Sequence, residues 1–444
     1  MKFSVRKILV AFAAISVITL PVKAQTADAH AQAHASASAQ AHTQAMEIHK
    51  SAHESAMDNH RSALEEHNRA VERFNRAFRD FEEDNLIEER ISATRVRKMK
   101  KETSYISIPA NDANIRYTGR TLAASDGSVS FDWSGTYLEV TFTGGYIAMR
   151  VSDTKKNYYN VFIDGFPAGT VETFGKDSLI VLAGAPDKRE HTLRLQKRSE
   201  GEQGTTTIHS FELAKGGKLL KFEPGRNGLI EFIGDSITAG YGTEAKSKSE
   251  PFKAQTENCN LAYGAIISRY FNTDYTFIAH SGRGAARNYG DTARVSKNSM
   301  KERMMQTFDE NPAHRWNFKS YKPSLVIINL GSNDFSTKPH PQKEEFLGAY
   351  SIIIAQIREV YGDVPVLCVA PPKGAAFDYL QSFCKEKGDN NLHFAAYLNG
   401  VYGGDGDLGA SAHPNYNGQK KIAMNLIPYI SSIMGWELTG KAAR

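Results

Sequence analysis

The stretch LIEFIGDSITAGYG, from Leu229 to Gly242, decides how the second half of the chain is interpreted. Its apolar run ends abruptly in Gly234, Asp235 and Ser236. These residues are ordinary turn formers, but α/β folds also place their chemistry where a strand ends at the carboxyl edge of a sheet. The surrounding sequence has to decide between a simple turn and an exposed nucleophile.

Beyond Leu229, short apolar runs alternate with helical patterns. Ala349, Ile353 and Ile357 mark one face of such a helix. Strand–helix alternation predicts a parallel sheet covered by helices on both faces, here over residues 221–438. The expected strands are 229–234, 274–282, 324–331 and 364–372, and the expected helices are 261–271 and 344–361.

Residues 103–220 show a different period. Runs of alternating polar and apolar residues, separated by Gly, Asn and Asp, are typical of an antiparallel sandwich, and two sheets of the jelly-roll type fit best. The runs are SVSFDW (128–133), YLEVTF (137–142), YIAMRVS (146–152), YYNVFID (158–164), SLIVLAG (178–184), HTLRLQ (191–196) and TTIHSFEL (206–213).

The N-terminal residues 1–24 have a basic start, an apolar run and a small-residue exit at Ala24, which predicts a secretory signal peptide and a secreted or periplasmic protein. An uncleaved membrane anchor is the alternative, although the apolar run is short for a span.

Residues 25–102 are rich in Ala and His and then acquire a heptad, in which His53, His60 and His67 recur every seven residues. This pattern predicts a long helix or coiled coil that serves self-association. A plain spacer is one alternative. Metal binding through pairs such as His49 and His53 is another, because seven of the 14 histidines lie in this segment.

Bulk composition excludes some functions. The net charge of +5 comes from 54 basic and 49 acidic residues, a balance that does not indicate a nucleic-acid partner. The three cysteines are expected to be buried free thiols. No phosphate loop, no GxSxG elbow and no metal-ligand spacing occurs in residues 103–438, so no cofactor and no metal is expected there.

Three of the predicted strands end in polar clusters, and a fourth cluster, SAHPNYNGQKKIA (411–423), lies near the C-terminus. Together they suit acyl transfer. Ser236 is the candidate nucleophile and His413 its base. The backbone N–H groups of Ser236 and Gly282 and the side-chain amide of Asn333 are candidate oxyanion donors. Pro414 could open a helix after the histidine.

These four blocks resemble those of the SGNH (GDSL-like) hydrolases, whose name lists Ser, Gly, Asn and His. Gly284 is an alternative to Gly282 for the glycine. The segments IRYTGR (115–120), WSGTYLEVTFTG (133–144) and NYYNVFIDG (157–165), followed by SGRGAARNYG (281–290), make the chain similar to carbohydrate esterase family 2 over roughly residues 114–436. The resemblance implies an SGNH flavodoxin-like α/β domain behind the jelly roll.

The chain departs from the SGNH hydrolases in the residue that would orient the histidine. There an Asp three residues earlier orients the imidazole, but position 410 is Ala. The resemblance implies that a main-chain carbonyl can replace it, giving a Ser236–His413 dyad. Ser411, Asp405 and Asp407 are the other candidate orienters, whereas Asp235 and Asp334 are expected to stabilise turns.

Trp316 is a candidate wall for a sugar ring, although ordinary packing explains a tryptophan equally well. The polar residues 243–258 are expected to form a rim loop. The resemblance implies an acetylxylan-type esterase that removes O-acetyl groups from plant polysaccharide, with a 6-O preference. An esterase for bacterial cell-wall or lipid esters, or a carbohydrate-binding surface protein with weak activity, is the alternative.

Overall fold

The computed structural model describes residues 105–184, 189–398 and 400–438. The expected signal peptide (1–24) and the His-rich helical segment (25–102) lie outside these ranges, so cleavage, secretion, self-association and histidine-based metal binding stay predictions. No helix within the described ranges combines the length and the apolar composition of a membrane span.

A β-sandwich of two antiparallel sheets forms the first part of the described chain, as the alternating pattern predicts. Alternate side chains of both sheets, among them Val140, Phe211 and Leu195, meet in one buried core. One sheet contains β1 (Tyr105–Pro109), β3 (Leu122–Ala123), β4 (Val129–Phe131), β6 (Tyr146–Asp153), β9 (Ser178–Gly184) and β11 (Thr206–Ala214). The other contains β2 (Arg116–Thr118), β5 (Tyr137–Phe142), β7 (Lys156–Ile163), β8 (Phe166–Phe174), β10 (His191–Lys197) and β12 (Leu219–Leu220).

A five-stranded parallel sheet follows, in the order β14-β13-β15-β16-β17. Its strands are β13 (Leu229–Gly234), β14 (Asp274–Ala279), β15 (Leu325–Asn329), β16 (Val366–Ala370) and β17 (Leu392–Ala396). This 2-1-3-4-5 order is flavodoxin-like, and ligands bind such sheets at the carboxyl ends where the strand order reverses. The reversal point lies at β13, the strand that precedes Ser236.

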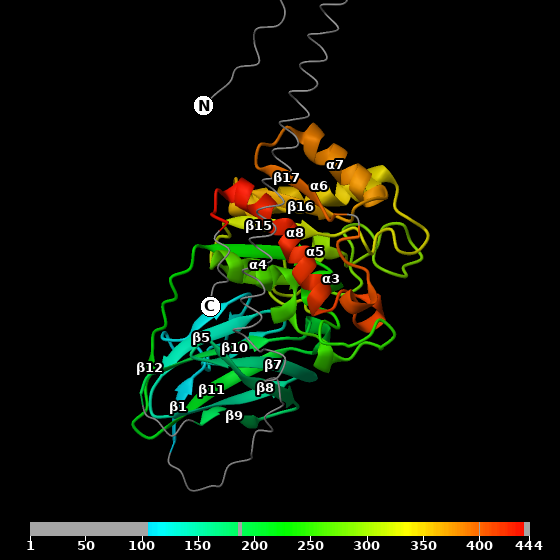
Figure 1. Cartoon of the computed structure of the whole chain (residues 1–444). Coiled ribbons are helices and arrows are strands. Elements are labelled where there is room, and N and C mark those ends of the chain that lie inside the picture. Colours follow the sequence, from blue (N-terminus) through cyan, green and yellow to red (C-terminus); the bar gives the residue numbers. More distant parts are fainter. Residues whose placement is uncertain (1–104, 185–188, 399, 439–444) are drawn as a thin grey trace, which may run out of the picture. The chain divides into compact units, whose positions relative to one another are not determined.

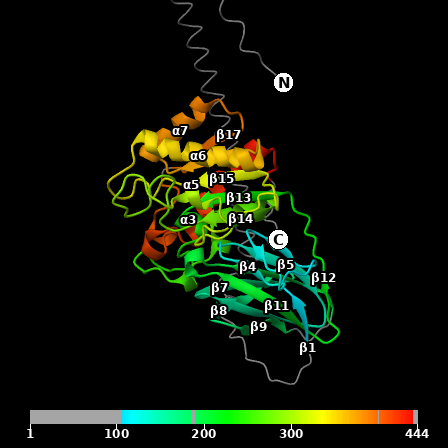
Figure 2. The same cartoon turned by 180° about the vertical axis from the view of Figure 1, so that it is seen from behind.

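Helices cover both faces of this sheet (Figures 1 and 2). Helix α6 packs against α7 and α4 packs against α8. Ala349, Ile353 and Ile357 of α6 are buried, which confirms the predicted face. The helices are α3 (Ser236–Ala239), α4 (Tyr263–Phe271), α5 (Met300–Arg303), α6 (Lys343–Tyr361), α7 (Ala375–Lys387) and α8 (Tyr416–Met434). Cys259, Cys368 and Cys384 are buried free thiols.

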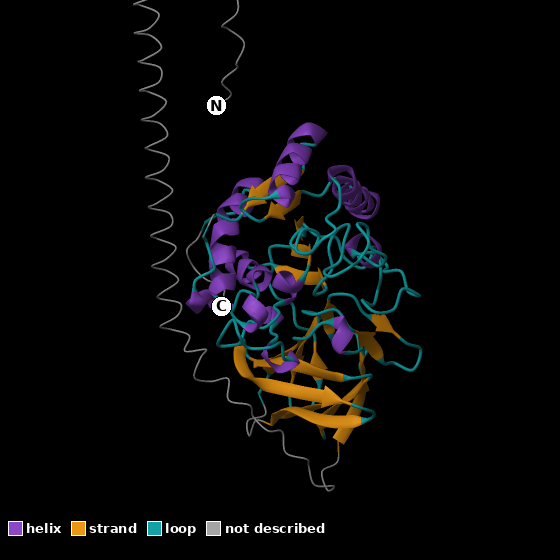
Figure 3. Cartoon of the chain, turned by 90° about the vertical axis from the view of Figure 1, so that its right-hand side faces the viewer, coloured by secondary structure: helices purple, strands orange, loops and turns teal. Residues whose placement is uncertain are grey.

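The sandwich lies against the helix-covered sheet (Figure 3), and buried side chains connect the two. Arg120 of the sandwich is fully buried and donates to the carbonyl oxygens of Met304 and Gln306, at 2.7 Å each. Trp133, also from the sandwich, packs into the apolar cluster of the parallel sheet. These two hydrogen bonds from Arg120 Nη1 fix the orientation of the buried guanidinium, and they connect the two parts of the chain.

Candidate active site

Ser236 stands at the first position of a very short helix that begins directly after β13. Asp235 caps this helix, because its Oδ1 accepts a hydrogen bond from the N–H of Ile237 at 3.0 Å. The first N–H groups of a helix have no intrahelical acceptor. The backbone N–H of Ser236 is therefore available at the sheet edge, beside the hydroxyl of the same residue.

The hydroxyl of Ser236 and the imidazole of His413 are in hydrogen-bond contact. Ser236 Oγ lies 2.9 Å from His413 Nε2. The other ring nitrogen, Nδ1, lies 3.2 Å from the main-chain carbonyl oxygens of both Ala410 and Ser411. A ring whose Nδ1–H donates to a carbonyl presents an unprotonated Nε2, the form that can accept the serine proton.

The backbone that carries these carbonyls is held from outside. Ser411 and Ala412 have positive φ angles of 50° and 59°, and such values cost free energy unless neighbouring structure imposes them. Here the N–H of Ser411 donates to the carbonyl of Glu250 at 2.9 Å, and that of Ala412 to the carbonyl of Lys248 at 3.2 Å. The loop 243–258, expected only as a rim, therefore supports the histidine turn.

Aromatic rings flank the imidazole. The ring centroid of Tyr241 lies 4.2 Å from that of His413, and Phe252 stacks on the far side of Tyr241 at 4.2 Å. Burial lowers the pKa of His413 below its ordinary value, although the two carbonyl contacts offset part of the change. Sequence reasoning missed Tyr241, although it closes the same GYG turn that follows Ser236.

The acidic candidates for orienting the histidine have other partners. Asp405 pairs with Lys248 at 2.8 Å, and Asp407 pairs with Lys421 at 2.8 Å. Ser411 contributes its main-chain carbonyl to His413. Helix α8 begins at Tyr416 with Asn415 as its cap. Pro414 therefore precedes the cap and does not open the helix as expected.

Gly282 is better placed than Gly284 to donate to an oxyanion. The N–H of Gly284 already donates to Asn288 Oδ1 at 3.3 Å, and a Cβ on Gly284 would lie 2.4 Å from Asp334 Oδ2. Gly282 has a φ of 76°, and a Cβ there would meet only Tyr289, at 3.8 Å. Among the described residues, no hydrogen-bond acceptor is recorded for the N–H of Gly282.

The amide of Asn333, which follows β15, connects the other two strand ends. Its Nδ2 donates to Asp235 Oδ2 at 3.2 Å and to the carbonyl of Arg283 at 2.9 Å. Burial raises the pKa of Asp235 to about 7. Both amide hydrogens are directed at protein acceptors, so an oxyanion must draw one of them away. The structure thus brings the Ser236, Gly282 and Asn333 segments together.

Two buried carboxyl groups brace the glycine loop. Asp334 accepts three backbone hydrogen bonds, from Ala285, Ala286 and Arg287, at 2.7 to 3.0 Å. Glu200, from the turn after β10 of the sandwich, accepts from both the N–H and the hydroxyl of Ser281. Burial raises the pKa of Glu200 well above its usual range, and the nearby Glu257 adds to this rise.

His280, Asp309 and Glu310 form a group of potential metal ligands that sequence spacing did not reveal. His280 Nδ1 lies 2.6 Å from Asp309 Oδ2. Arg303 pairs with both carboxylates, with Asp309 at 2.6 Å and Glu310 at 3.0 Å. Because Arg303 already supplies a positive charge to both carboxylates, we interpret the group as an ion-pair network and not as a metal site.

Trp316 does not form a sugar-binding wall. Its side chain is only 7% exposed, its ring lies 5.7 Å from that of Tyr321, and the guanidinium of Arg120 lies 5.9 Å from its centroid. The expectation of a substrate contact is therefore corrected, because the indole is enclosed between the sandwich and the parallel sheet.

Comparisons with known proteins show to which family the chain is similar. The profile of the carbohydrate esterase 2 N-terminal domain matches residues 117–222, and that of the GDSL-like lipase/acylhydrolases matches residues 230–426. A solved family two carbohydrate esterase from Clostridium thermocellum, in complex with cellohexaose, is 30% identical with a TM-score of 0.67. The match covers 73% of this chain and all of that one. The chain belongs to carbohydrate esterase family 2.

Two curated relatives match this chain over only part of their own length. The cellulase/esterase CelE of Acetivibrio thermocellus is 30% identical over 73% of this chain and 40% of its own length. An acetylxylan esterase/glucomannan deacetylase of Cellvibrio japonicus is 33% identical over 49% of this chain and 61% of its own length. The chain thus spans less than two thirds of either relative.

Proposed function

We propose that this family 2 protein is a serine esterase that removes O-acetyl groups from plant polysaccharide. The observation that supports it best is the 2.9 Å contact between Ser236 Oγ and His413 Nε2 at the carboxyl edge of the parallel sheet. The name of the Cellvibrio japonicus relative, acetylxylan esterase/glucomannan deacetylase, indicates the substrate class.

The chemistry runs through an acetyl-enzyme. Ser236 Oγ attacks the acetyl carbonyl carbon while His413 Nε2 takes the hydroxyl proton. The negative charge on the carbonyl oxygen is stabilised by the N–H groups of Ser236 and Gly282 and by the amide of Asn333. His413 then returns the proton to the departing sugar oxygen. In the second half, His413 takes a proton from a water molecule that attacks the acetyl-serine carbonyl carbon. His413 then returns that proton to Ser236 Oγ as the bond to the acetyl group breaks and acetate leaves.

His413 works in this scheme without a carboxylate partner. The carbonyl oxygens of Ala410 and Ser411 hold Nδ1, and Tyr241 restricts the ring. The carbonyls have only partial negative charge, so they stabilise the imidazolium less than an aspartate would. Orientation of the ring by the turn and by Tyr241 offsets part of that difference.

The acetyl group removed is on a primary, 6-O position, as the family resemblance implies. The signal peptide expected at residues 1–24 takes the enzyme out of the cytoplasm, to where polysaccharide is found.

Acetate release from acetylated xylan and acetylated glucomannan tests the proposal. We expect release by the wild type, and a loss of about 10⁴-fold or more in Ser236→Ala. Ser320→Ala, at an exposed serine, serves as the matched control and should retain full activity. Equal release by wild type and Ser236→Ala would refute the proposal, and release from neither polymer would refute the substrate class.

Glycan binding with weak turnover is the second candidate, and one observation favours it: the solved Clostridium thermocellum relative contains cellohexaose. Titration of the wild type with cellohexaose, in parallel with the acetate assay, separates the two roles. Tight binding without acetate release would favour a binding protein.

A further inference from the structure

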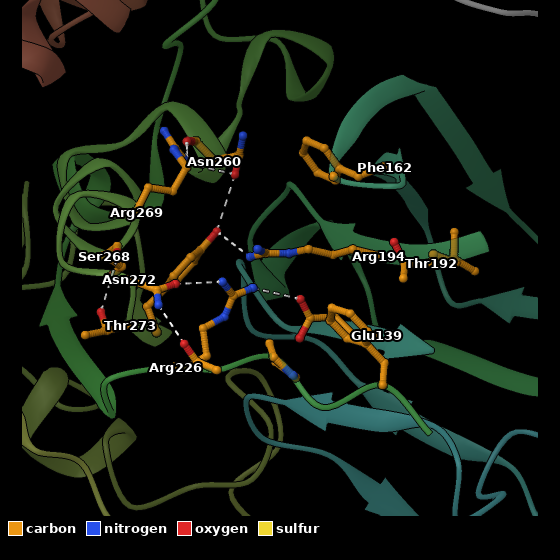
Figure 4. Close-up of a pocket in the computed structure, with 16 residues that line it drawn as sticks. Glu139, Phe162, Thr192, Arg194, Arg226, Asn260, Ser268, Arg269, Asn272 and Thr273 are labelled. Carbon is orange, nitrogen blue, oxygen red and sulfur yellow. Dashed lines mark hydrogen bonds and ion pairs between the residues drawn. The ribbon is translucent and has the colours of Figure 1, made fainter. Parts of the chain in front are cut away.

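A cavity lies at the amino end of the parallel sheet, opposite the edge that carries Ser236. Its volume is about 340 Å³, at the lower end of the range for small-ligand sites. Its walls come from β5, β7 and β10 of the sandwich, from the linker residues 222–226, from α4 and from the start of β14 (Figure 4). None of the proposed catalytic residues lines it, so it is called the junction pocket below.

Two arginines at this junction have matched counter-ions. Arg116 and Arg226 share the carboxylates of Glu139 and Asp274. Arg226 Nη2 lies 3.2 Å from Glu139 Oε1, and Arg226 Nε lies 3.5 Å from Asp274 Oδ1. Two cations and two anions thus balance one another at this ion-pair cluster, and Glu139 and Asp274 also act on Arg194 through space without an ion-pair contact.

Two other arginines of the junction pocket have only neutral partners. Arg194 Nη2 donates to the hydroxyl of Tyr275 at 3.0 Å, and its guanidinium lies 3.9 Å from the ring centroid of Tyr137. Arg269 Nη1 donates to the carbonyl and Oδ1 of Asn260, at 2.9 and 3.0 Å. In the described part of the chain, neither guanidinium has a carboxylate at ion-pair distance.

This arrangement leaves an excess of two positive charges in a partly enclosed space. Burying a cation without a counter-ion is costly, and the burial of Arg269 lowers its pKa. Arg194 and Arg269 reach the pocket from opposite walls, one from strand β10 and the other from helix α4 (Figure 4). An anion between them would relieve the excess charge and join the two domains.

The remaining lining indicates what kind of anion fits. Phe162 and Phe222 offer apolar ring faces, while Thr192, Asn260 and Asn272 offer hydroxyl and amide groups. Such a mixture suits a polar ring that carries several hydroxyl groups, and guanidinium groups pair with a carboxylate in planar, two-point geometry. We propose that the junction pocket binds a carboxylate-bearing sugar, a uronic acid, through Arg194 and Arg269.

Calorimetric titration of the full chain tests the inference directly, with D-glucuronate, methyl glucoside and inorganic phosphate as probes. We expect glucuronate to bind and methyl glucoside not to bind. Equal binding of the neutral sugar, or no binding of glucuronate by the wild type, would overturn the proposal. Phosphate bound more tightly than glucuronate would overturn the sugar in favour of a general anion site.

Substitution of the two arginines tests whether glucuronate binds in the junction pocket. Arg194→Gln and Arg269→Gln should each weaken glucuronate binding about tenfold or more. Arg315→Gln, which breaks an exposed pair with Glu359, is the matched control and should not change it. Hydrolysis of a small acetyl ester should stay at the wild-type rate in all three variants, because the pocket is separate from Ser236. Unchanged glucuronate affinity in both folded pocket variants would place the ligand elsewhere and refute the assignment.

Discussion

The side-chain carboxyl group of Glu200 accepts hydrogen bonds from both the backbone N–H and the hydroxyl of Ser281. Glu200 lies in the turn after β10 of the β-sandwich, whereas Ser281 immediately precedes Gly282 in the loop that follows β14. The sandwich therefore holds the loop that carries a proposed oxyanion donor. It contributes to the geometry of the site as well as covering the edge of the catalytic domain.

Replacement of Glu200 by Ala should lower kcat about 10- to 100-fold with little change in KM, because a small displacement of Gly282 weakens only transition-state contacts. Glu200→Gln should retain most activity. Burial raises the pKa of Glu200 well above its usual range, which favours the neutral acid over the carboxylate, and an amide resembles a neutral acid in shape and charge. Steady-state kinetics on a small acetyl ester, with circular dichroism as a folding control, measures both variants. Equal losses of kcat in Glu200→Ala and Glu200→Gln would contradict this prediction.

Restoring the aspartate that other SGNH hydrolases carry should not improve this enzyme. Ala410 is fully buried, and a Cβ placed on Gly242 would lie only 2.4 Å from the Cβ of Ala410. Ala410→Asp therefore forces a carboxylate into a filled space and should lower the free energy of unfolding by about 3 kcal/mol, with loss of activity. Urea unfolding and acetyl-ester hydrolysis check the two effects. A stable variant with higher kcat would show that the turn has room for the missing group.

Substitution of Ser411 tests whether the main chain or the side chains of the turn 410–412 position His413. Ser411 contacts His413 through its main-chain carbonyl, so Ser411→Ala should retain most of the wild-type kcat. Measured beside Ala410→Asp, it serves as the matched control. A large loss in Ser411→Ala would assign a role to the hydroxyl instead.

The strand ends of the site could be predicted because their signals are local. An apolar run that stops at Gly234 or at Gly331 indicates where a strand ends, and the polar residues that follow it are then expected at the sheet edge. In a parallel sheet those ends share one edge, so nearness of Ser236 and Asn333 followed from topology. Strands β8 and β17 were missed, since the Pro and Gly of the first and the short, His-containing run of the second weaken the alternating pattern.

The supports of the site could not be predicted, because they join segments far apart in the chain. Glu200 lies in a polar turn, EGEQG, which has the composition of a surface loop. Its burial arises only when the two domains meet. Likewise, the positive φ angles of Ser411 and Ala412 depend on carbonyl groups of the loop 243–258. No residue pattern marks a backbone acceptor, so the carbonyl contacts of His413 came from the resemblance and not from the residues.

Asn333→Ala should lower kcat about 100-fold while leaving KM nearly unchanged, because the amide donates to charge that develops in the transition state. The pair Asn333→Ala and Asn333→Asp, measured on the same acetyl ester, tests this interpretation. Asp has the same size but offers no donor to an oxyanion, so its loss should be at least as large as that of Ala. Activity retained in Asn333→Asp would exclude donation by this side chain.

The pH dependence of kcat/KM reports the base in the free enzyme. His413 must be neutral to accept the serine proton, and burial lowers its pKa from the ordinary 6.5. A lower pKa means that the ring loses its proton at a lower pH, so activity should rise with pH through a midpoint below 6.5. Asp235 precedes Ser236, and burial raises its pKa to about 7, so it is a second candidate for the acid limb. Rates measured from pH 4 to pH 8 for wild type and Asp235→Asn distinguish them. If the midpoint of the rise in kcat/KM is unchanged in Asp235→Asn, the group that titrates is His413. If the rise disappears in that variant, the group is Asp235.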